Sequence, residues 1–324
     1  MGPIGEGYDR RARLLDCAPS ARRPPLSMSN DRAPLDATAF GIMVLCTALW
    51  GFQQVAIKLA AHDVSLVMQA GIRSIVAAAL LLVWARLRGI ALFRRDGTLL
   101  PGIAAGLLFG GEFVFIYAGL GYTSASRMIV FIYLAPVVAA LGLHLFVRGE
   151  RLVRGQWLGV LLSFAGVVLA FANGFAAGRD TTLLGDLFGV IGAALWGATT
   201  VLVRASRLAG VTATKTLFYQ LAVSALMLPL ASALMGEPGV VALTPLALAS
   251  LAYQGAIVAF ASYLAWFWLL TRYLAARLSV FSFLTPMFGV LAGVLVLGEP
   301  LTPAFGAAAL LVGAGIVLVN LRGR

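Results

Sequence analysis

The sequence predicts an all-α integral membrane protein in which ten transmembrane helices form two inverted five-helix repeats. Three observations lead to this fold class: a hydrophobic composition, an internal duplication and an uneven placement of basic residues. Hydrophobic residues make up 61% of the 324 residues and charged residues 11%, whereas soluble domains carry about 25% charged residues. Apolar runs of about 20 residues, long enough to cross a bilayer, fill most of the chain after residue 38.

One segment of the chain occurs twice. Phe131–Gly166 has an apolar run with one proline, a Gly-Glu turn and a second apolar run with spaced glycines, and Phe281–Gly315 repeats this pattern. An earlier tetrapeptide, Ala48–Gly51, returns in the same order as Ala194–Gly197. The protein is therefore predicted to be an internal duplication. The landmarks Phe131, Pro136, Glu150 and Gly166 recur as Phe281, Pro286, Glu299 and Gly315, at offsets of 149 to 150 residues.

The apolar runs define ten predicted spans, five in each copy. Because five is an odd number, the second copy enters the membrane from the opposite side. Inverted repeats of this kind are typical of secondary transporters, whose substrate site lies near the midplane between the repeats. The first repeat domain is placed at residues 38–173 and the second at 184–321. The spans are 39–60, 66–87, 99–120, 125–147, 156–173, 184–206, 213–235, 245–271, 276–297 and 302–321.

The basic residues indicate the orientation in the membrane. Twenty of the 24 lysines and arginines lie in the N-terminal tail, in alternate connections and after the last span, whereas the other connections contain only Arg179. Cytoplasmic loops carry the excess of lysine and arginine, so both termini are predicted to be cytoplasmic, with the chain in the inner membrane of the cell. Residues 1–37 are polar and basic and are predicted to be a disordered tail, with Met28 as an alternative start to Met1.

No motif in the chain indicates catalysis or nucleic-acid binding. The net charge of +11 comes from arginines in short connections rather than from one basic stripe. The sequence has no HExxH, GxSxG or CxxC motif, so we predict no enzyme activity, metal or cofactor. Gly210–Thr216 resembles a phosphate-binding loop, but Lys215 stands where the second glycine belongs.

A set of landmarks in both copies has the pattern of a known transporter family. These landmarks are Ala48–Gly51, Lys58, Arg73, Tyr122, Thr123, Pro136, Gly149, Glu150, Gly159, Gly166, Trp196, Gly197, Arg204, Pro286, Gly298, Glu299 and Gly315. The pattern resembles the drug/metabolite transporter superfamily, specifically ten-span exporters with two EamA domains, over about residues 39–321. The resemblance implies efflux of amino acids, other metabolites or drugs without indicating the substrate. It departs from symmetry at Ala308 and Val223, which stand opposite Gly159 and Arg73.

Polar residues inside the spans are few and therefore point to a binding site. Trp50 is followed one turn later by Gln53, and at the same offset Trp196 is followed by Thr199. Symmetric helices would thus present aromatic and hydrogen-bonding groups to an apolar pocket with a few polar contacts. These four residues and Tyr263 are the predicted substrate-binding residues. The alternative is that the tryptophans only fill the core.

Glu112 is the only carboxylate deep inside a predicted span, and it follows Gly110 and Gly111. An ionised carboxylate in the membrane is costly, so such residues are functional by default. We expect Glu112 to couple proton movement to transport or to bind a substrate amine. The alternative is a structural role, either an ion pair with Arg73 or a hydrogen bond to a neighbouring helix. The duplication places Tyr263 opposite Glu112.

Five further residues are assigned structural or gating roles. Arg73 lies about two turns into its span, close enough to the outer surface to snorkel, and substrate contact stays open as the alternative to a structural role. Pro136 and Pro286 interrupt matching spans as hinges or cavity-lining breaks. The glutamates after spans 4 and 9 are expected to form helix-end or gating ion pairs, and Lys58 and Arg204 to be interfacial anchors. The five are Arg73, Pro136, Glu150, Pro286 and Glu299.

These patterns predict a secondary active transporter that exports small metabolites such as amino acids by alternating access between the repeats. The expected partners are a small-molecule substrate, the lipid bilayer and protons as a coupling ion. Two alternatives stay open: efflux of drugs or other cations by the same fold, and a membrane enzyme or scaffold. The residues do not specify the substrate, the direction of transport or the oligomeric state.

Overall fold

The computed structural model describes residues 35–123, 125–172, 183–298 and 303–321. Regular structure within these ranges is helical, apart from an isolated bridge between Val64 and Val240 in two loops. The helices belong to one compact unit, Arg32–Arg324. Glu299 lies outside the described residues, and so do residues 1–34 of the predicted tail.

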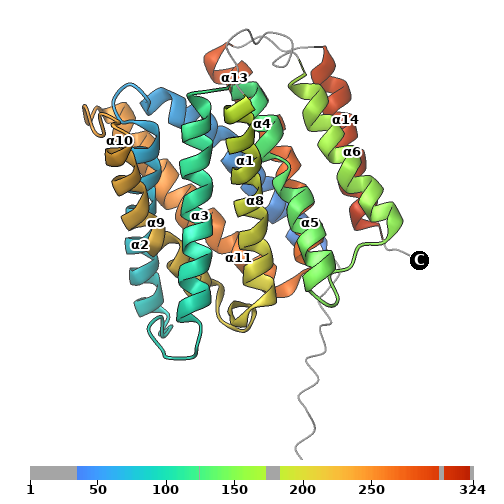
Figure 1. The fold of residues 1–324 in the computed structure, drawn as a ribbon, viewed down its shortest axis with the longest axis horizontal. Coiled ribbons are helices and arrows are strands. Elements are labelled where there is room, and N and C mark those ends of the chain that lie inside the picture. The colour runs from blue at the N-terminus through green and yellow to red at the C-terminus, as the bar shows by residue number, and fades with distance from the viewer. Residues whose placement is uncertain (1–34, 124, 173–182, 299–302, 322–324) are drawn as a thin grey trace, which may run out of the picture. The chain divides into compact units, whose positions relative to one another are not determined.

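The described residues of the first half, up to residue 172, form six helices (Figure 1). They are α1 (Ala37–Ala60), α2 (Leu66–Leu87), α3 (Leu99–Leu120), α4 (Ala125–Ile132), α5 (Ala135–Phe146) and α6 (Arg154–Ala170). The second half begins with α8 (Leu183–Ala205), the 3₁₀ turn η1 (Arg207–Gly210) and α9 (Ala213–Leu234). It continues through α10 (Pro245–Ala252), the π-helix η2 (Tyr253–Ser262), α11 (Tyr263–Arg272), α12 (Ala275–Ser279), the 3₁₀ turn η3 (Val280–Phe283), α13 (Leu284–Leu297) and α14 (Ala304–Asn320).

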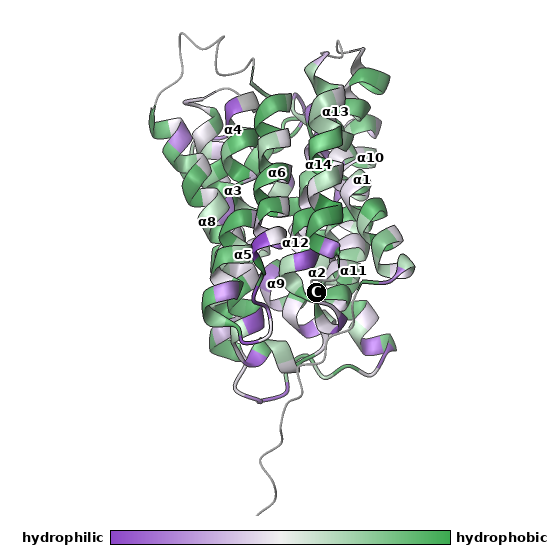
Figure 2. Ribbon diagram, turned by 90° about the vertical axis from the view of Figure 1, so that its right-hand side faces the viewer, coloured by the Kyte–Doolittle hydropathy of each residue, from purple (hydrophilic) through white to green (hydrophobic). Residues whose placement is uncertain are grey.

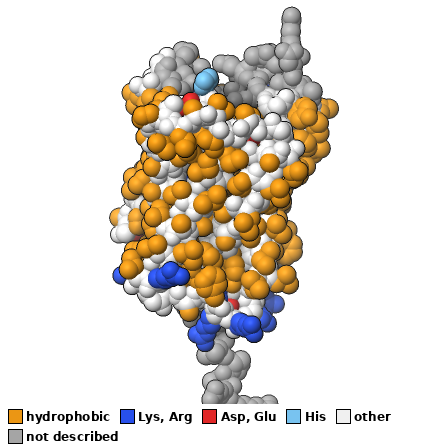
Figure 3. Space-filling view, turned by 90° about the vertical axis from the view of Figure 1, so that its left-hand side faces the viewer, with side chains coloured by type: hydrophobic (Ala, Val, Ile, Leu, Met, Phe, Trp, Pro, Cys, Tyr) orange, Lys and Arg blue, Asp and Glu red, His pale blue; other side chains and the backbone are white. Residues whose placement is uncertain are grey.

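Eight helical segments of the described chain are long and apolar enough to cross a membrane, and α6 and α14 are shorter apolar helices of 17 residues each. Hydrophobic residues run along the helices, and hydrophilic ones gather toward the loops at the lower end (Figure 2). Hydrophobic side chains also cover the middle of the face in Figure 3, with lysine and arginine at its lower end. We call this lower end the basic end. The predicted all-α, multi-pass membrane fold is confirmed.

Two spans are interrupted rather than continuous. The helix predicted over 125–147 stops after Ile132 and restarts at Ala135, so that Pro136 lies in the first turn of α5. The span predicted over 276–297 passes through η3 before α13, and Pro286 lies in the first turn of α13. Proline lacks a backbone N–H and clashes with the preceding turn, and the first turn of a helix tolerates it. The π-helix at Tyr253–Ser262 was not expected from the sequence.

Glycines allow several helix pairs to approach closely. A Cβ atom on Gly159 in α6 would lie 2.6 Å from the Gly315 oxygen in α14, and the two helices lie side by side in Figure 1. A Cβ atom on Gly51 in α1 would lie 2.7 Å from the backbone nitrogen of Gly289 in α13. Small residues at such crossings favour association of membrane helices, because close contact replaces the hydrophobic drive that lipid removes.

Candidate functional site

A cavity of about 570 Å³ lies among helices of both halves of the chain. Its volume is within the range of small-molecule sites, roughly 300–1,000 Å³. The lining is mostly aromatic and aliphatic and includes a few polar groups, which is the composition typical of such sites. Residues from α1, α2, α3, α4, α8, α9, α11 and α13 contribute to it.

All five residues predicted to bind substrate line this cavity: Trp50, Gln53, Trp196, Thr199 and Tyr263. The Trp50 indole Nε1 donates a 2.9 Å hydrogen bond to the Ser262 hydroxyl, which fixes the ring against the last residue of η2. The Thr199 hydroxyl donates to the Leu195 carbonyl of its own helix at 2.9 Å. The structure thus brings together side chains from α1, α8 and α11 that are far apart in the sequence.

The aromatic lining is continuous. Ring centroids are 5.4 Å apart between Phe113 and Phe109, and 6.0 Å apart between Phe109 and Tyr263. Trp50 lies 6.0 Å from Tyr263 and 6.0 Å from Trp266, in edge-to-face contacts. Such arrangements are favourable for aromatic pairs, so these five rings, which we call the aromatic wall, form one connected surface inside the cavity.

Glu112 lies on the cavity-facing side of α3 and is 6% exposed. Its Oε2 atom has no hydrogen-bond partner among the described residues. The glycines before it serve packing, because a Cβ atom on Gly110 would lie 3.0 Å from the Met227 sulfur and one on Gly111 3.3 Å from the Leu195 side chain. Glu112 therefore presents a carboxylate to the cavity from a tightly packed helix.

The prediction that Arg73 snorkels to the outer surface is wrong. Arg73 is 2% exposed and lines the cavity, and its guanidinium carbon lies 4.3 Å from the centroid of the Phe113 ring. The reason is tertiary packing: neighbouring helices cover α2 at this level. Arg73 and Glu112 interact electrostatically, but the ion pairs among the described residues do not include one between them.

Of the residues assigned structural or gating roles, some line the cavity and others lie outside it. Pro286 lines the cavity, whereas Pro136 is buried and does not. Glu150 is fully buried and accepts hydrogen bonds from Arg204, with Nε at 3.0 Å and Nη2 at 2.5 Å. It also accepts the backbone N–H groups of Ala275 and Ala276 at 3.1 and 3.2 Å, at the start of α12. Arg204 is therefore buried in an ion pair and is not the interfacial anchor that the sequence suggested.

Several lining residues were not predicted from the sequence. On α3, the stripe that carries Glu112 and Tyr117 also presents Phe109, Phe113, Ile116 and Leu120 to the cavity. The position of Glu112 gives the signal that could have found them, because residues three and four apart share a helix face. Gln220 of α9 also lines the cavity, fully buried, and neither of its amide atoms has a partner among the described residues. No pattern in the sequence indicated that Gln220 would line the cavity.

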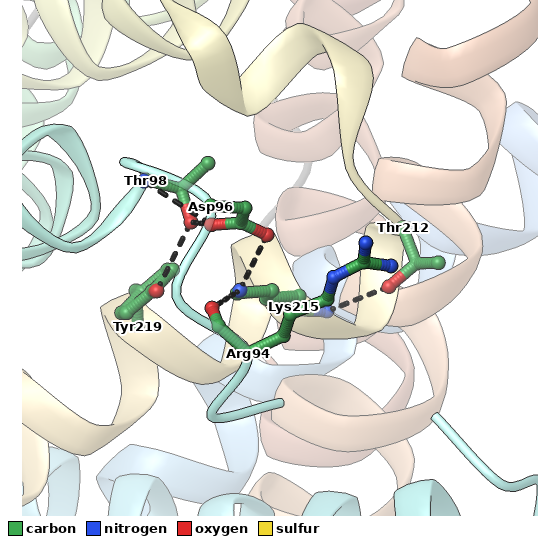
Figure 4. Close-up of polar contacts among 6 residues, drawn as sticks. All are labelled: Arg94, Asp96, Thr98, Thr212, Lys215 and Tyr219. Atoms are coloured by element: carbon green, nitrogen blue, oxygen red, sulfur yellow. Dashed lines mark hydrogen bonds and ion pairs between the residues drawn. The ribbon is translucent and has the colours of Figure 1, made fainter. Parts of the chain in front are cut away.

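A polar cluster joins the loop between α2 and α3 to the start of α9 (Figure 4). The Lys215 ammonium donates to Asp96 Oδ2 at 2.7 Å and to the Arg94 carbonyl at 2.9 Å. Thr98 donates to Asp96 Oδ1 at 2.5 Å and contacts the Tyr219 hydroxyl at 3.1 Å. The hydrogen bond from Lys215 lowers the pKa of Asp96 to about 2. Lys215 is thus engaged by a carboxylate, which argues against a phosphate-binding loop at this position.

Fold and cavity define a class: a multi-pass α-helical membrane protein with a central small-molecule cavity. Two stretches, residues 38–172 and 183–321, match the EamA-like transporter family. The chain belongs to this family and is a membrane transporter, which confirms the resemblance seen in the sequence.

Similar proteins include transporters from archaea and bacteria. An uncharacterized transporter of Archaeoglobus fulgidus is 27% identical over 86% of this chain and 96% of its own length. A probable amino-acid metabolite efflux pump of Salmonella typhimurium is 24% identical over 86% of this chain and 93% of its own. A pump of the same description from Escherichia coli is 23% identical over 87% of this chain and 95% of its own. A solved crystal structure, 22% identical, shares the fold with a TM-score of 0.74 over 88% of this chain and 98% of its own.

Proposed function

We propose that this protein is a secondary active exporter of small metabolites of the amino-acid class, working by alternating access between two inverted five-helix repeats. The observation that carries the proposal is the aromatic cavity with Glu112 inside it, shared by both halves of the chain. Two relatives that cover nearly the whole chain are named as probable amino-acid metabolite efflux pumps. The chain is proposed to transport its substrate and not to transform it.

Symmetric contacts support the inverted repeat. A Cβ atom on Gly51 of α1 would meet Phe288 of α13 at 2.7 Å, and one on Gly197 of α8 would meet Val138 of α5 at 2.7 Å. Gly51 corresponds to Gly197 in the duplication and Phe288 to Val138, so each half packs against the other in the same way. The repeat domains are placed at 38–173 and 184–321, with α6 and α14 as short fifth and tenth spans that local thinning of the bilayer can accommodate.

The charge distribution supports an orientation with both termini in the cytoplasm and the chain in the inner membrane. Lysine and arginine gather at the basic end (Figure 3), which is the pattern of a cytoplasmic face. A reporter that is active only in the cytoplasm, fused after Arg324, should therefore be active. The same reporter inserted in the α1–α2 connection, after His62, should be inactive and serves as the control. An inactive C-terminal fusion together with an active loop fusion would show that the orientation is the opposite of the proposed one.

The position of the cavity suggests which state the structure represents. Its lining includes Lys58, which is exposed near the end of α1 that lies away from the basic end. The lining residues nearest the basic end, Val203 and Leu270, are buried, at 5% and 3% exposure. At the basic end, Glu150 ties Arg204 to the start of α12. We assign the structure to an outward-facing state, in which the cavity communicates with the outer side. Export requires a second state in which the contacts of Glu150 open.

Glu112 is the proposed coupling residue. The charged and titratable groups that interact with it come from two further helices, Arg73 from α2 and Tyr263 from α11. A single carboxylate that binds either a proton or a substrate ammonium group cannot hold both at once. Alternation between the two occupants would exchange protons for substrate across the membrane.

The decisive experiment is transport by the purified full chain in liposomes with an imposed proton gradient. We expect gradient-dependent flux of one or more amino acids from a panel that also contains cationic drugs. Trp50→Ala and Trp196→Ala should each lower substrate affinity by about 2- to 10-fold, because each removes an aromatic contact worth roughly 0.5–1.5 kcal/mol.

Trp268→Ala is the matched control, since Trp268 stacks on Arg272 and does not line the cavity. Flux of the cationic drugs alone would favour the multidrug alternative. Flux of no compound would favour a membrane enzyme or scaffold. Affinities unchanged in both cavity variants would remove the tryptophans from the binding site.

A further inference from the structure

The side chains of an arginine and a glutamate lie buried in one cavity without forming an ion pair with each other. Arg73 is 2% exposed and Glu112 is 6% exposed, and both line the cavity. Buried charged groups are normally paired, because removing an unpaired charge from water is costly. In this chain no ion pair among the described residues joins the two side chains.

Both side chains retain unused hydrogen-bonding capacity. Arg73 Nε and Nη2 have no hydrogen-bond partner among the described residues, and neither does Glu112 Oε2. The Phe113 ring, 4.3 Å from the Arg73 guanidinium carbon, supports the guanidinium plane without using its N–H groups. The protein thus presents a guanidinium donor fork and a carboxyl group to the same space.

An apolar surface continues from this charged pair. The aromatic wall begins at Phe113, beneath Arg73, and runs through Phe109, Tyr263 and Trp50 to Trp266. A ligand held by both charges would therefore place its remaining atoms against aromatic rings. The cavity volume of about 570 Å³ can hold a molecule of this kind.

We propose that Arg73 and Glu112 together bind the zwitterionic head of an α-amino acid with a large apolar side chain. Arg73 receives the α-carboxylate through its planar fork, and Glu112 receives the α-ammonium. The side chain packs on the aromatic wall. Charge-assisted hydrogen bonds of this type are stronger than neutral ones, and the guanidinium fork matches carboxylate geometry. The assignment rests on the proposed export of amino-acid metabolites and specifies the substrate class and the role of Arg73.

Binding without a gradient tests this assignment separately from transport. Calorimetry on the detergent-solubilised full chain would compare phenylalanine with phenylalanine methyl ester, which lacks the carboxylate, and N-acetylphenylalanine, which lacks the ammonium. Each analogue leaves either Arg73 or Glu112 without its partner on the ligand, and such charge-assisted hydrogen bonds are stronger than neutral ones. We expect each analogue to bind about 10- to 100-fold more weakly than phenylalanine.

Reciprocal variants assign each charge to its partner. Arg73→Gln should weaken phenylalanine by about 10- to 100-fold and leave the methyl ester unchanged. Glu112→Gln should weaken phenylalanine and the methyl ester and leave N-acetylphenylalanine unchanged. Arg88→Gln, at the end of the same helix as Arg73, removes a cation outside the cavity and should change nothing. Thermal unfolding of each variant, followed by tryptophan fluorescence, checks that it is folded.

The outcomes separate the zwitterion site from transport itself. If amino acids are transported but all three ligands bind wild-type protein equally, the zwitterion site is wrong and the exporter stands. Arg73→Gln that is folded and binds phenylalanine with unchanged affinity overturns the site as well. If no panel compound is transported and none of the three ligands binds, the proposed function fails and the site with it.

Discussion

Replacing Glu112 with glutamine is expected to abolish proton-driven transport while leaving the protein folded. Glutamine keeps the shape and hydrogen-bonding capacity of the side chain but cannot exchange a proton. Glu112 makes no hydrogen bond through Oε2 with the described residues, so the substitution removes no such contact from the fold. The expected result is flux at the level of empty liposomes when a proton gradient is the only driving force.

A second measurement ties the loss to coupling rather than to binding alone. In weakly buffered solution, substrate binding to wild-type protein should release protons, and binding to the variant at saturating substrate should release none. Glu112→Asp, which keeps a titratable carboxyl group on a shorter side chain, should retain some driven flux. Transport in Glu112→Gln that resembles wild type and keeps its pH dependence would exclude the coupling role.

Replacing Glu150 with alanine is expected to destabilise the protein by about 3–5 kcal/mol, because removing one partner of a buried pair leaves an uncompensated charge. The Arg204 side chain, 3% exposed, would lose its ion pair. The N–H groups of Ala275 and Ala276 would lose the acceptor at the start of α12. The measurement is unfolding of the purified protein in detergent, followed by tryptophan fluorescence and compared at matched detergent concentration.

Two further variants make this result specific. Arg151→Ala removes an exposed neighbour in the same connection and should leave stability unchanged. The double variant Glu150→Leu with Arg204→Met replaces the pair with apolar side chains and should recover part of the loss, since buried pairs are often replaceable in this way. A Glu150→Ala protein as stable as wild type would show that the pair contributes little to holding the basic end together.

The sequence by itself determined the class of fold and the family. Apolar runs of about 20 residues indicate helices in a bilayer, because a helix satisfies its backbone hydrogen bonds within its own segment. Approximate helix positions therefore follow from the apolar runs. The repeated Trp50 and Trp196, each with a polar residue one turn later, were enough to predict residues that line the cavity. Glu112 was identifiable because a carboxylate in an apolar run has few structural explanations.

Only the tertiary structure decided which polar residues meet. Spans that are apolar on nearly every face carry little periodic signal, so the sequence could not show that Arg73 turns inward to the cavity and not outward to the lipid surface. The place of Arg204 at the end of a span predicted an interfacial anchor. The tertiary structure instead places Arg204 of α8 against Glu150, which also binds the start of α12. The Glu150–Arg204 pair joins segments that are 54 residues apart in the sequence. Local sequence does not encode the distance in space between such segments.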